Sequence, residues 1–274
     1  MTPTARYCDI VFPVTTFLER EDVIYGSNNY LFYSQKAVEP LYESRNDYDI
    51  FSDLSRKLGF YDDFSEKRTA NEWLAFLLEE SEIEDIEAFR STGLYLGKDQ
   101  KRIGLTEFIG SPSEHPLDTM TGKIEMSSVA CSAEGYPNHP VCRITEPPSD
   151  YPLRLITPHS HVRINSTLAN LEWTKKLESN ELVINPVDSS KRNINDGDMV
   201  CVKSPQGRMH ISARVNEDII PGVVYLQQGR WVDFDNSGNE IAGSPNVLTS
   251  TVPTLPSQGS RTHTIFVEVS QVFD

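Results

Sequence analysis

The sequence predicts an α/β segment followed by an all-β region that closes into a small barrel. Before residue 80, apolar residues recur at helical spacing beside capping signals. A stretch rich in proline, serine and glycine covers residues 111–150, and short β-branched runs separated by turn residues follow it. We therefore predict an α/β piece at residues 1–60, a helical and irregular connection at 61–150, and a barrel at 151–274.

The first expected element is a short strand at Ile10–Phe12. This apolar run stops at Pro13, and it is typical of a buried parallel strand. A strand of that kind needs neighbours on both sides, and the nearby sequence supplies none. We therefore expect the opening residues to be one piece of a larger α/β domain.

Two helices are expected next. Asn46 can cap the first, which covers residues 46–58 and ends at Gly59. Thr69 and Glu72 have the spacing of a capping box at the start of the second helix. Each helix has an apolar face. These faces are Ile50, Phe51, Leu54 and Leu58 in the first helix, and Trp73, Leu74, Leu77 and Leu78 in the second.

The C-terminal region contains at least six candidate strands in roughly 120 residues, which predicts a small barrel. Pro147–Pro148 marks the boundary before them, and Gln206–Gly207 is expected to form a hairpin turn. Apolar residues alternate in the run that follows this turn, as in a strand with one buried face. The expected strands are residues 153–156, 181–184, 199–203, 209–215, 223–227 and 264–269.

Composition narrows the classes of function. The formal charge of −15 argues against a nucleic-acid partner, which would need a basic surface. The four cysteines, Cys8, Cys131, Cys142 and Cys201, form no CxxC pair, so neither an iron–sulfur cluster nor a zinc site is indicated. The sequence contains no run of about 18 apolar residues and no secretory signal. If the native protein is exported, its signal is expected upstream of residue 1.

Several strings of the sequence carry a specific resemblance to one family. The string MTPTARYCDIVFPVTTFLERED matches a family pattern at Thr4, Ala5, Asp9, Val11 and Pro13, and Cys8 replaces the usual alanine. The family's order is also kept by LITPHSHVRINST, ELVINPVDSSKRNINDGDMVCVKSPQG, PGVVYLQQGRW and SPNVLTS. The chain thus resembles the molybdenum oxidoreductases of the dimethyl sulfoxide reductase family. Within that family, the string EKRTANEWLAFL followed by AFRSTGLY is similar to the catalytic subunit of the membrane-anchored, respiratory dimethyl sulfoxide reductases, and this is the subgroup we favour.

This resemblance implies a fold for each part of the chain. Residues 151–274 would form a six-stranded double-psi β-barrel, the domain that binds molybdopterin guanine dinucleotide. Residues 1–60 would be the C-terminal piece of the family's molybdopterin oxidoreductase α/β domain. The string TGKIEM, at residues 121–126, is similar to a short strand of the family. The chain would then be the C-terminal part of a longer enzyme, and we expect it to be inactive and free of metal when alone.

The resemblance also assigns residues to the cofactor. Hydroxyls, amides, backbone N–H groups and a few cations suit a ligand made of diphosphates, guanines and pterin edges. Such groups gather in the loop after the first barrel strand and at two later positions. The assigned residues are Thr157, His159, Ser160, Arg163, Asn165, Ser166, Thr167, Asn246 and Gln258. No catalytic residue and no metal ligand are assigned.

Other interpretations of the same residues stay open. The loop could simply be polar and cap a helix that begins near Thr167. His159 and His161 form an HxH pair that could bind zinc, although no third ligand accompanies it. Trp231 could line the cofactor groove or pack into the core. Asp233–Gly238 imitates the first half of a calcium loop but lacks its final glutamate, so we expect a surface turn.

For the longer enzyme, the resemblance implies bis(molybdopterin guanine dinucleotide) with molybdenum, and an iron–sulfur cluster in the upstream part. It implies reduction of a small sulfoxide or N-oxide, an iron–sulfur electron-transfer subunit and a membrane anchor subunit. The enzyme would be exported to the outer face of the cytoplasmic membrane of a prokaryote. A polysulfide, thiosulfate or selenate reductase would share every string quoted, and a stand-alone cofactor-binding or assembly module is the other alternative. The substrate and the choice between molybdenum and tungsten are not encoded by these patterns.

Overall fold

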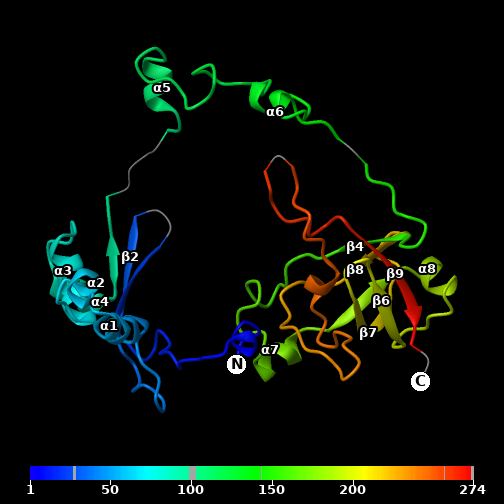
Figure 1. The fold of residues 1–274 in the computed structure, drawn as a ribbon, viewed down its shortest axis with the longest axis horizontal. Coiled ribbons are helices and arrows are strands. Elements are labelled where there is room, and N and C mark those ends of the chain that lie inside the picture. The colour runs from blue at the N-terminus through cyan, green and yellow to red at the C-terminus, as the bar shows by residue number, and fades with distance from the viewer. Residues whose placement is uncertain (27–28, 99–102, 143, 256, 273–274) are drawn as a thin grey trace. The chain divides into compact units, whose positions relative to one another are not determined.

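A computed structural model describes residues 1–26, 29–98, 103–142, 144–255 and 257–272. The chain divides into two compact units (Figure 1). Residues 8–110 form the first, which we call the sheet unit, and residues 1–7 together with 111–274 form the second, the barrel unit. The boundaries predicted at residues 60 and 150 stay predictions. In the described part of the chain, no helix is long and apolar enough to cross a membrane.

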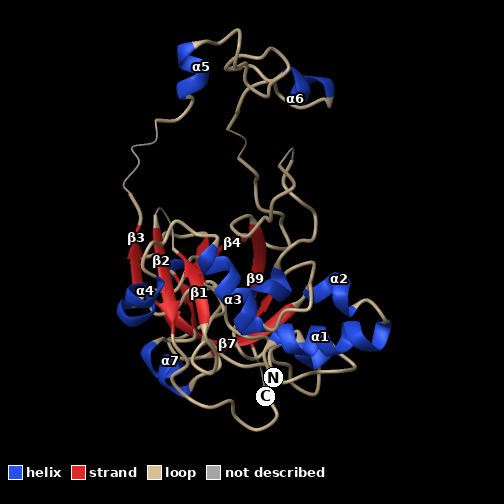
Figure 2. Cartoon of the chain, turned by 90° about the vertical axis from the view of Figure 1, so that its left-hand side faces the viewer, coloured by secondary structure: helices blue, strands red, loops and turns tan. Residues whose placement is uncertain are grey.

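The sheet unit is built on three antiparallel strands, β1 (Asp22–Tyr25), β2 (Tyr30–Ser34) and β3 (Leu94–Leu96), with β2 in the centre. Successive side chains of a strand point to opposite faces. Residues of one face pack with α3 (Ala70–Glu79) and α4 (Ile86–Thr92). Figure 2 shows these two helices and the three strands. The core of this unit consists of Tyr33, Leu78, Ile83 and Phe89.

Both predicted helices of this unit are confirmed. The first is α1 (Asp47–Leu58), in which the Asn46 side chain accepts a hydrogen bond from the Tyr48 N–H. Gly59 ends it with a φ of +84°, a conformation that favours glycine. The second is α3, where the capping box of Thr69 and Glu72 is present.

The apolar face of α1 is largely exposed. Phe51, Leu54 and Leu58 are exposed, whereas Ser52 and Ser55 are buried. The short helix α2 (Tyr61–Ser65) packs beside α1 and itself buries Ser65. The contact between the two helices includes the stacked rings of Tyr48 and Phe64. An amphipathic pattern identifies an apolar face but does not supply the element that covers it.

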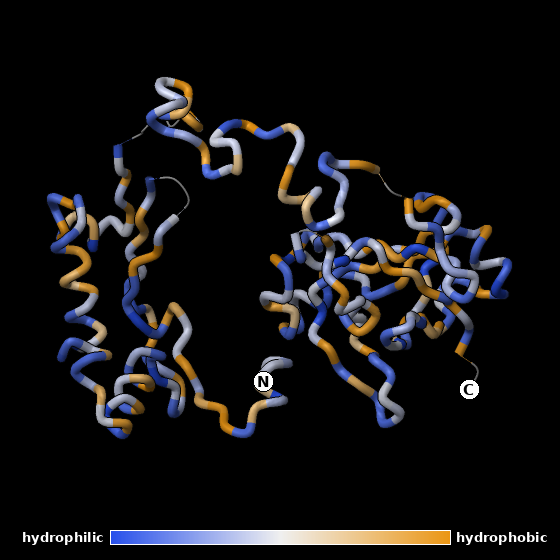
Figure 3. Tube along the Cα trace, turned by 45° about the horizontal axis from the view of Figure 1, so that its top comes forward, coloured by the Kyte–Doolittle hydropathy of each residue, from blue (hydrophilic) through white to orange (hydrophobic). Residues whose placement is uncertain are grey.

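Two predicted strands in irregular regions are wrong. Ile10–Phe12 lies outside every strand, and its residues are between 47% and 72% exposed. Figure 3 shows this hydrophobic stretch after the N-terminal coil. The nearest pairing is an isolated parallel bridge between Val14 and Arg45, and one bridge cannot satisfy the backbone groups of a buried strand. Residues 121–126 form turns and bends, with Met126 90% exposed.

The six-stranded barrel predicted for the C-terminal region is confirmed. The strands are β4 (Leu153–Ile156), β5 (Glu181–Ile184), β6 (Met199–Lys203), β7 (Arg208–Val215), β8 (Val223–Tyr225) and β9 (Ile265–Gln271). They close in the order β4-β8-β5-β7-β6-β9. The hairpin between β6 and β7 includes a hydrogen bond from the Ser204 N–H to the Gly207 carbonyl, as the Gln206–Gly207 turn predicted. Alternate residues of each strand fill the core, among them Leu155, Leu182, Val202 and Val267.

The strand pairing explains why long loops leave this barrel. β4 pairs with β8 in parallel, and β5 pairs with β7 in parallel, while the other neighbours are antiparallel. Of these strands, only β6 and β7 are both consecutive in the chain and paired with each other, so the other consecutive strands need longer connections. These connections carry α7 (Glu172–Leu177), α8 (Pro186–Ser190) and the 3-10 helix η2 (Pro245–Leu248).

The remaining helices are short. They are the 3-10 helix η1 (Ala5–Tyr7), α5 (Thr106–Gly110) and α6 (Val129–Ala133). The helix expected near Thr167 is α7, which begins at Glu172 after a series of turns. Asp233–Gly238 forms a turn in which the Asp235 carboxylate accepts hydrogen bonds from the backbone N–H groups of Ser237 and Asn239. The surface turn predicted there is confirmed.

Candidate functional site

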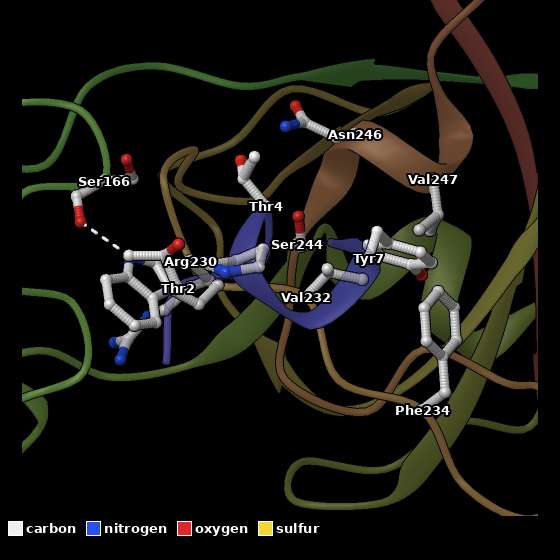
Figure 4. A pocket seen from close by; sticks show the side chains of 12 residues that line it. Thr2, Thr4, Tyr7, Ser166, Arg230, Val232, Phe234, Ser244, Asn246 and Val247 are labelled. Carbon is white, nitrogen blue, oxygen red and sulfur yellow. Dashed lines mark hydrogen bonds between the residues drawn. The ribbon is translucent and has the colours of Figure 1, made fainter. Parts of the chain in front are cut away.

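A cavity of about 630 Å³ lies in the barrel unit. It is lined by the N-terminal segment that includes η1, by the loop after β4, by the segment after β8 and by η2 (Figure 4). Its walls are Thr2, Pro3, Thr4, Tyr7, Ser166, Arg230, Trp231, Val232, Phe234, Ser244, Asn246 and Val247. Cavities of a few hundred cubic ångströms that combine apolar walls with a small number of polar groups are typical of small-molecule sites.

Polar and aromatic groups both contribute to the walls of this cavity. Figure 4 shows Ser166 at one end, beside the Trp231 indole that donates to its carbonyl. Tyr7, Phe234 and Val247 lie at the other end, and Thr4 and Asn246 lie between the two ends. An amide can donate and accept hydrogen bonds in one plane, and aromatic rings offer a stacking surface. This arrangement suits a planar heteroaromatic ring with polar edges.

The loop after β4 is joined to the segment after β8 by side-chain hydrogen bonds. The Trp231 indole N–H donates to the Ser166 carbonyl at 2.8 Å, the bond dashed in Figure 4. The Arg163 guanidinium donates to the Gln228 carbonyl at 3.0 Å and to the Asn165 carbonyl at 2.5 Å. These bonds fix the two segments that form one wall of the cavity.

A buried ionic network lies behind this wall. The Glu178 carboxylate, with its side chain 2% exposed, pairs with Arg163 Nε at 2.9 Å and with Arg230 Nη2 at 3.2 Å. It also accepts a hydrogen bond from the Ser160 hydroxyl. Burial lowers the pKa of Arg230, with the neighbouring Glu178 acting in the opposite direction. Because the site holds two guanidinium groups and one carboxylate, it retains one net positive charge.

The structure brings two of the nine predicted cofactor residues, Ser166 and Asn246, into the cavity wall. Ser160 and Arg163 belong to the ionic network behind it, where Arg163 already has three protein partners. Asn165 supplies a carbonyl to that network and has a φ of +49°. Direct contact of these residues with the cofactor stays a prediction.

The other predicted residues lie away from the cavity wall. Thr157 is buried and its hydroxyl donates to the Thr262 carbonyl at 2.8 Å. His159 is exposed and contacts the Gln228 amide at 3.0 Å. Thr167 is exposed, and its N–H donates to the Ile164 carbonyl. Gln258 lies in a separate turn with a φ of +55°. The described residues contain no cluster of three or more potential metal ligands, at His159 and His161 or elsewhere.

A second buried carboxylate holds the opposite wall. Glu240 is 0% exposed, and its carboxylate accepts backbone hydrogen bonds from Ala242 at 3.0 Å and Gly243 at 2.9 Å. Its own backbone bridges to Met209 of β7 and to Phe234. Glu240 therefore ties the loop before Ser244 and Asn246 to the barrel.

Burial raises the pKa of Glu240 above its ordinary value of 4.5, while the backbone hydrogen bonds oppose this rise. A raised pKa means that the folded state binds the proton more tightly than the unfolded state. The resulting stability is present below about pH 4.5 and is lost as the pH rises through the folded pKa. We therefore expect the free energy of unfolding of the native chain, minus that of Glu240→Gln, to fall as the pH rises. Urea denaturation of both proteins at several pH values measures this, and a value that rises with pH would contradict it.

Sequence reasoning missed Glu178, Arg230, Glu240 and the N-terminal residues that line the cavity. The adjacent Arg230 and Trp231 in a string otherwise rich in apolar residues were one available signal. A buried arginine requires an anionic partner, but the sequence does not say which glutamate provides it.

Comparison with known proteins identifies the family. Residues 1–57 match the family model described as molybdopterin oxidoreductase, and residues 153–266 match the molydopterin dinucleotide binding domain. The chain is also 32% identical to dimethyl sulfoxide reductase DmsA of Haemophilus influenzae, over 99% of this chain and 37% of that protein. The chain belongs to the molybdopterin oxidoreductases. The resemblance stated from the sequence is thereby confirmed, and the family's dinucleotide-binding domain coincides with the barrel.

Other known proteins show similar relationships. Dimethyl sulfoxide reductase DmsA of Escherichia coli is 32% identical over 99% of this chain and 37% of its own length. Trimethylamine-N-oxide reductase of Haemophilus influenzae is 32% identical over 98% of this chain and 37% of its own length. Acetylene hydratase from Pelobacter acetylenicus has the same fold, with a TM-score of 0.76 and 19% identity over 99% of this chain and 39% of that one. The chain therefore spans well under half of the length of these relatives.

Proposed function

We propose that this chain binds part of a molybdopterin guanine dinucleotide in the cavity of the barrel unit, within a molybdenum oxidoreductase that reduces a small sulfoxide or N-oxide. The observation that supports this most directly is the position of Ser166 and Asn246. Both were assigned to the cofactor from the sequence, and both line one cavity. The match of residues 153–266 to the dinucleotide-binding domain supports the same assignment.

The residues present fit such a ligand chemically. Guanine and pterin share one ring edge, in which an amino group and a carbonyl flank a ring nitrogen. The Asn246 amide can pair with that edge because it offers a donor and an acceptor together. Tyr7, Trp231 and Phe234 provide aromatic surface for the ring, and Ser166 provides a hydroxyl for a polar substituent.

When bound, the molybdenum cofactor supplies the oxygen-atom transfer chemistry. The task of this chain is to hold and orient one end of the ligand and to exclude water from it. Asn246 and Ser166 would orient the ring, and the walls held by Glu178 and Glu240 would keep that geometry fixed. Preorganised walls reduce the entropy that binding costs.

The names of the similar proteins support the proposed substrates. They are reductases of dimethyl sulfoxide and of trimethylamine N-oxide. We further propose that an iron–sulfur cluster, an iron–sulfur electron-transfer subunit and a membrane anchor subunit act with the complete enzyme on the outer face of the cytoplasmic membrane. A polysulfide, thiosulfate or selenate reductase is the alternative within the family. Purifying the complete enzyme and assaying each oxidised substrate with a reduced viologen distinguishes these possibilities.

Binding of guanosine diphosphate (GDP) by the purified chain tests the cavity itself. We expect weak, saturable binding that Asn246→Ala reduces about tenfold, as expected when one hydrogen bond of about 1.4 kcal/mol is lost. Cys131→Ala is the control, because Cys131 lies in α6 and does not line the cavity. Equal GDP affinity of both variants in equilibrium dialysis would argue against the proposed site.

A further inference from the structure

The cavity of the barrel unit has one charged residue in its wall. Among the described residues that line it, Arg230 carries the charge and the others are hydroxyl, amide, aromatic or aliphatic. No acidic side chain of the described part of the chain belongs to that wall. Beside this wall, Arg6 and Asp233 form an ion pair without net charge. The net charge nearest the cavity is therefore that of Arg230 and the groups that contact it.

Those groups leave the positive charge of Arg230 incompletely compensated. Glu178 is shared with Arg163, whose Nε takes the closer position at 2.9 Å. Arg230 Nη2 is 3.2 Å from the same carboxylate, yet this buried atom makes no hydrogen bond with any described residue. The Arg230 side chain is 9% exposed, so bulk water contributes little to its solvation. An arginine remains protonated in such surroundings.

We infer that Arg230 makes this cavity selective for an anionic ligand, so that a phosphorylated guanine or pterin compound binds and its uncharged analogue is discriminated against. This inference rests on the proposed function, and it adds the residue that makes the cavity select for the charge of that ligand. A charge surrounded by protein is screened less by salt and acts over longer distances than one in water. Arg230 thus favours an anion in the cavity through its field, without a direct hydrogen bond.

Glu178 is the positioning residue in this arrangement. It holds Arg163 and Arg230 together despite their like charges, and Arg163 in turn fixes the carbonyl of Gln228 two residues before Arg230. The position of the Arg230 guanidinium therefore depends on one buried carboxylate. Glu178 is the acidic residue that pairs with it in the described part of the chain.

The experiment compares GDP with guanosine in nuclear magnetic resonance titrations of the full chain, because such titrations measure weak binding. The ratio of the two affinities is obtained within one protein, so a partial loss of folded protein does not change it. We expect the native chain to bind GDP at least about tenfold more tightly than guanosine, a factor that corresponds to about 1.4 kcal/mol. Arg230→Met should reduce the ratio about tenfold, and Arg230→Lys should retain most of it because the charge is kept.

Arg214→Met is the matched control, because Arg214 is an exposed arginine of β7 that does not line the cavity. Its ratio should equal that of the native chain. Equal affinities for GDP and guanosine in the native chain would overturn the inference but leave the proposed function standing. An unchanged ratio in Arg230→Met would do the same. Failure of both ligands to bind the native chain would overturn the proposed function together with the inference.

Discussion

Replacing Glu178 by alanine is expected to destabilise the barrel unit by about 3–5 kcal/mol, because it leaves two buried guanidinium groups without their carboxylate. The Glu178 side chain is 2% exposed, and it contacts Ser160, Arg163 and Arg230. Loss of the carboxylate also removes the only anion in this network of described residues. For a unit of this size, the unfolding temperature should fall by about 6–20 °C.

Glu172→Ala is the control for this change. Glu172 is the first residue of α7, the helix that Glu178 follows directly. It pairs with Lys175 at 2.7 Å, but its side chain is 79% exposed. Exposed pairs of this kind contribute little, so this variant should unfold almost like the native chain. Differential scanning calorimetry of both variants measures the contrast. Similar small changes in both would show that the Glu178 network does not stabilise the barrel.

Gly229→Ala is the second change with a large expected effect. Gly229 has a φ of +92°, and a Cβ atom there would collide with the Asn165 carbonyl and Arg163 Nη1. The left-handed conformation costs a non-glycine residue about 1–2 kcal/mol, and the collision with backbone adds an overpacking cost of about 1–3 kcal/mol. We expect a total of about 2–5 kcal/mol, together with displacement of the loop that carries Ser166.

Gly238→Ala separates the two causes. Gly238 has a φ of +78°, but an added Cβ would meet nothing within 4 Å. This variant should therefore show the conformational cost of about 1–2 kcal/mol alone. Denaturant unfolding of both proteins gives the two values. If Gly229→Ala is no less stable than Gly238→Ala, the close approach of the two loops is not as the structure describes.

Much of the barrel could be predicted from the sequence because its signals are local. Short β-branched runs, turn residues such as Gln206–Gly207 and the alternation in Met209–Val215 all act over a few residues. The predicted strands agree with the structure to within a few residues, and the strand after Pro221–Gly222 ends earlier, at Tyr225. The helix caps at Asn46 and Thr69 were predictable for the same reason.

The features that could not be predicted depend on partners distant in sequence. The apolar pattern of α1 gave no information about what covers Phe51 and Leu54, and the described chain leaves them exposed. Similarly, Ile10–Phe12 has the composition of a strand but lacks neighbours. For the site, the loop residues followed from the family resemblance, whereas the pairing of Glu178 with Arg230 required the folded barrel. Sequence periodicity describes one helix or strand at a time, so it cannot identify ion pairs between residues that are far apart in the sequence.

The central claim is that the cavity beside Ser166 and Asn246 binds a guanine-type ring, and the indole signals of the tryptophans test it most directly. The chain has three tryptophans. Trp231 lines the cavity, Trp73 donates to the Tyr48 hydroxyl in the sheet unit, and Trp173 is an exposed residue of α7. Each indole N–H gives one nuclear magnetic resonance signal, and Trp231→Phe identifies the one from the cavity.

Addition of GDP to the ¹⁵N-labelled chain should shift the Trp231 signal saturably, because the ring binds beside an indole that is held by the Ser166 carbonyl. The Trp73 and Trp173 signals should remain in place. Shifts of Trp73 or Trp173 with Trp231 unmoved, or no shift of any indole at millimolar GDP, would contradict the account.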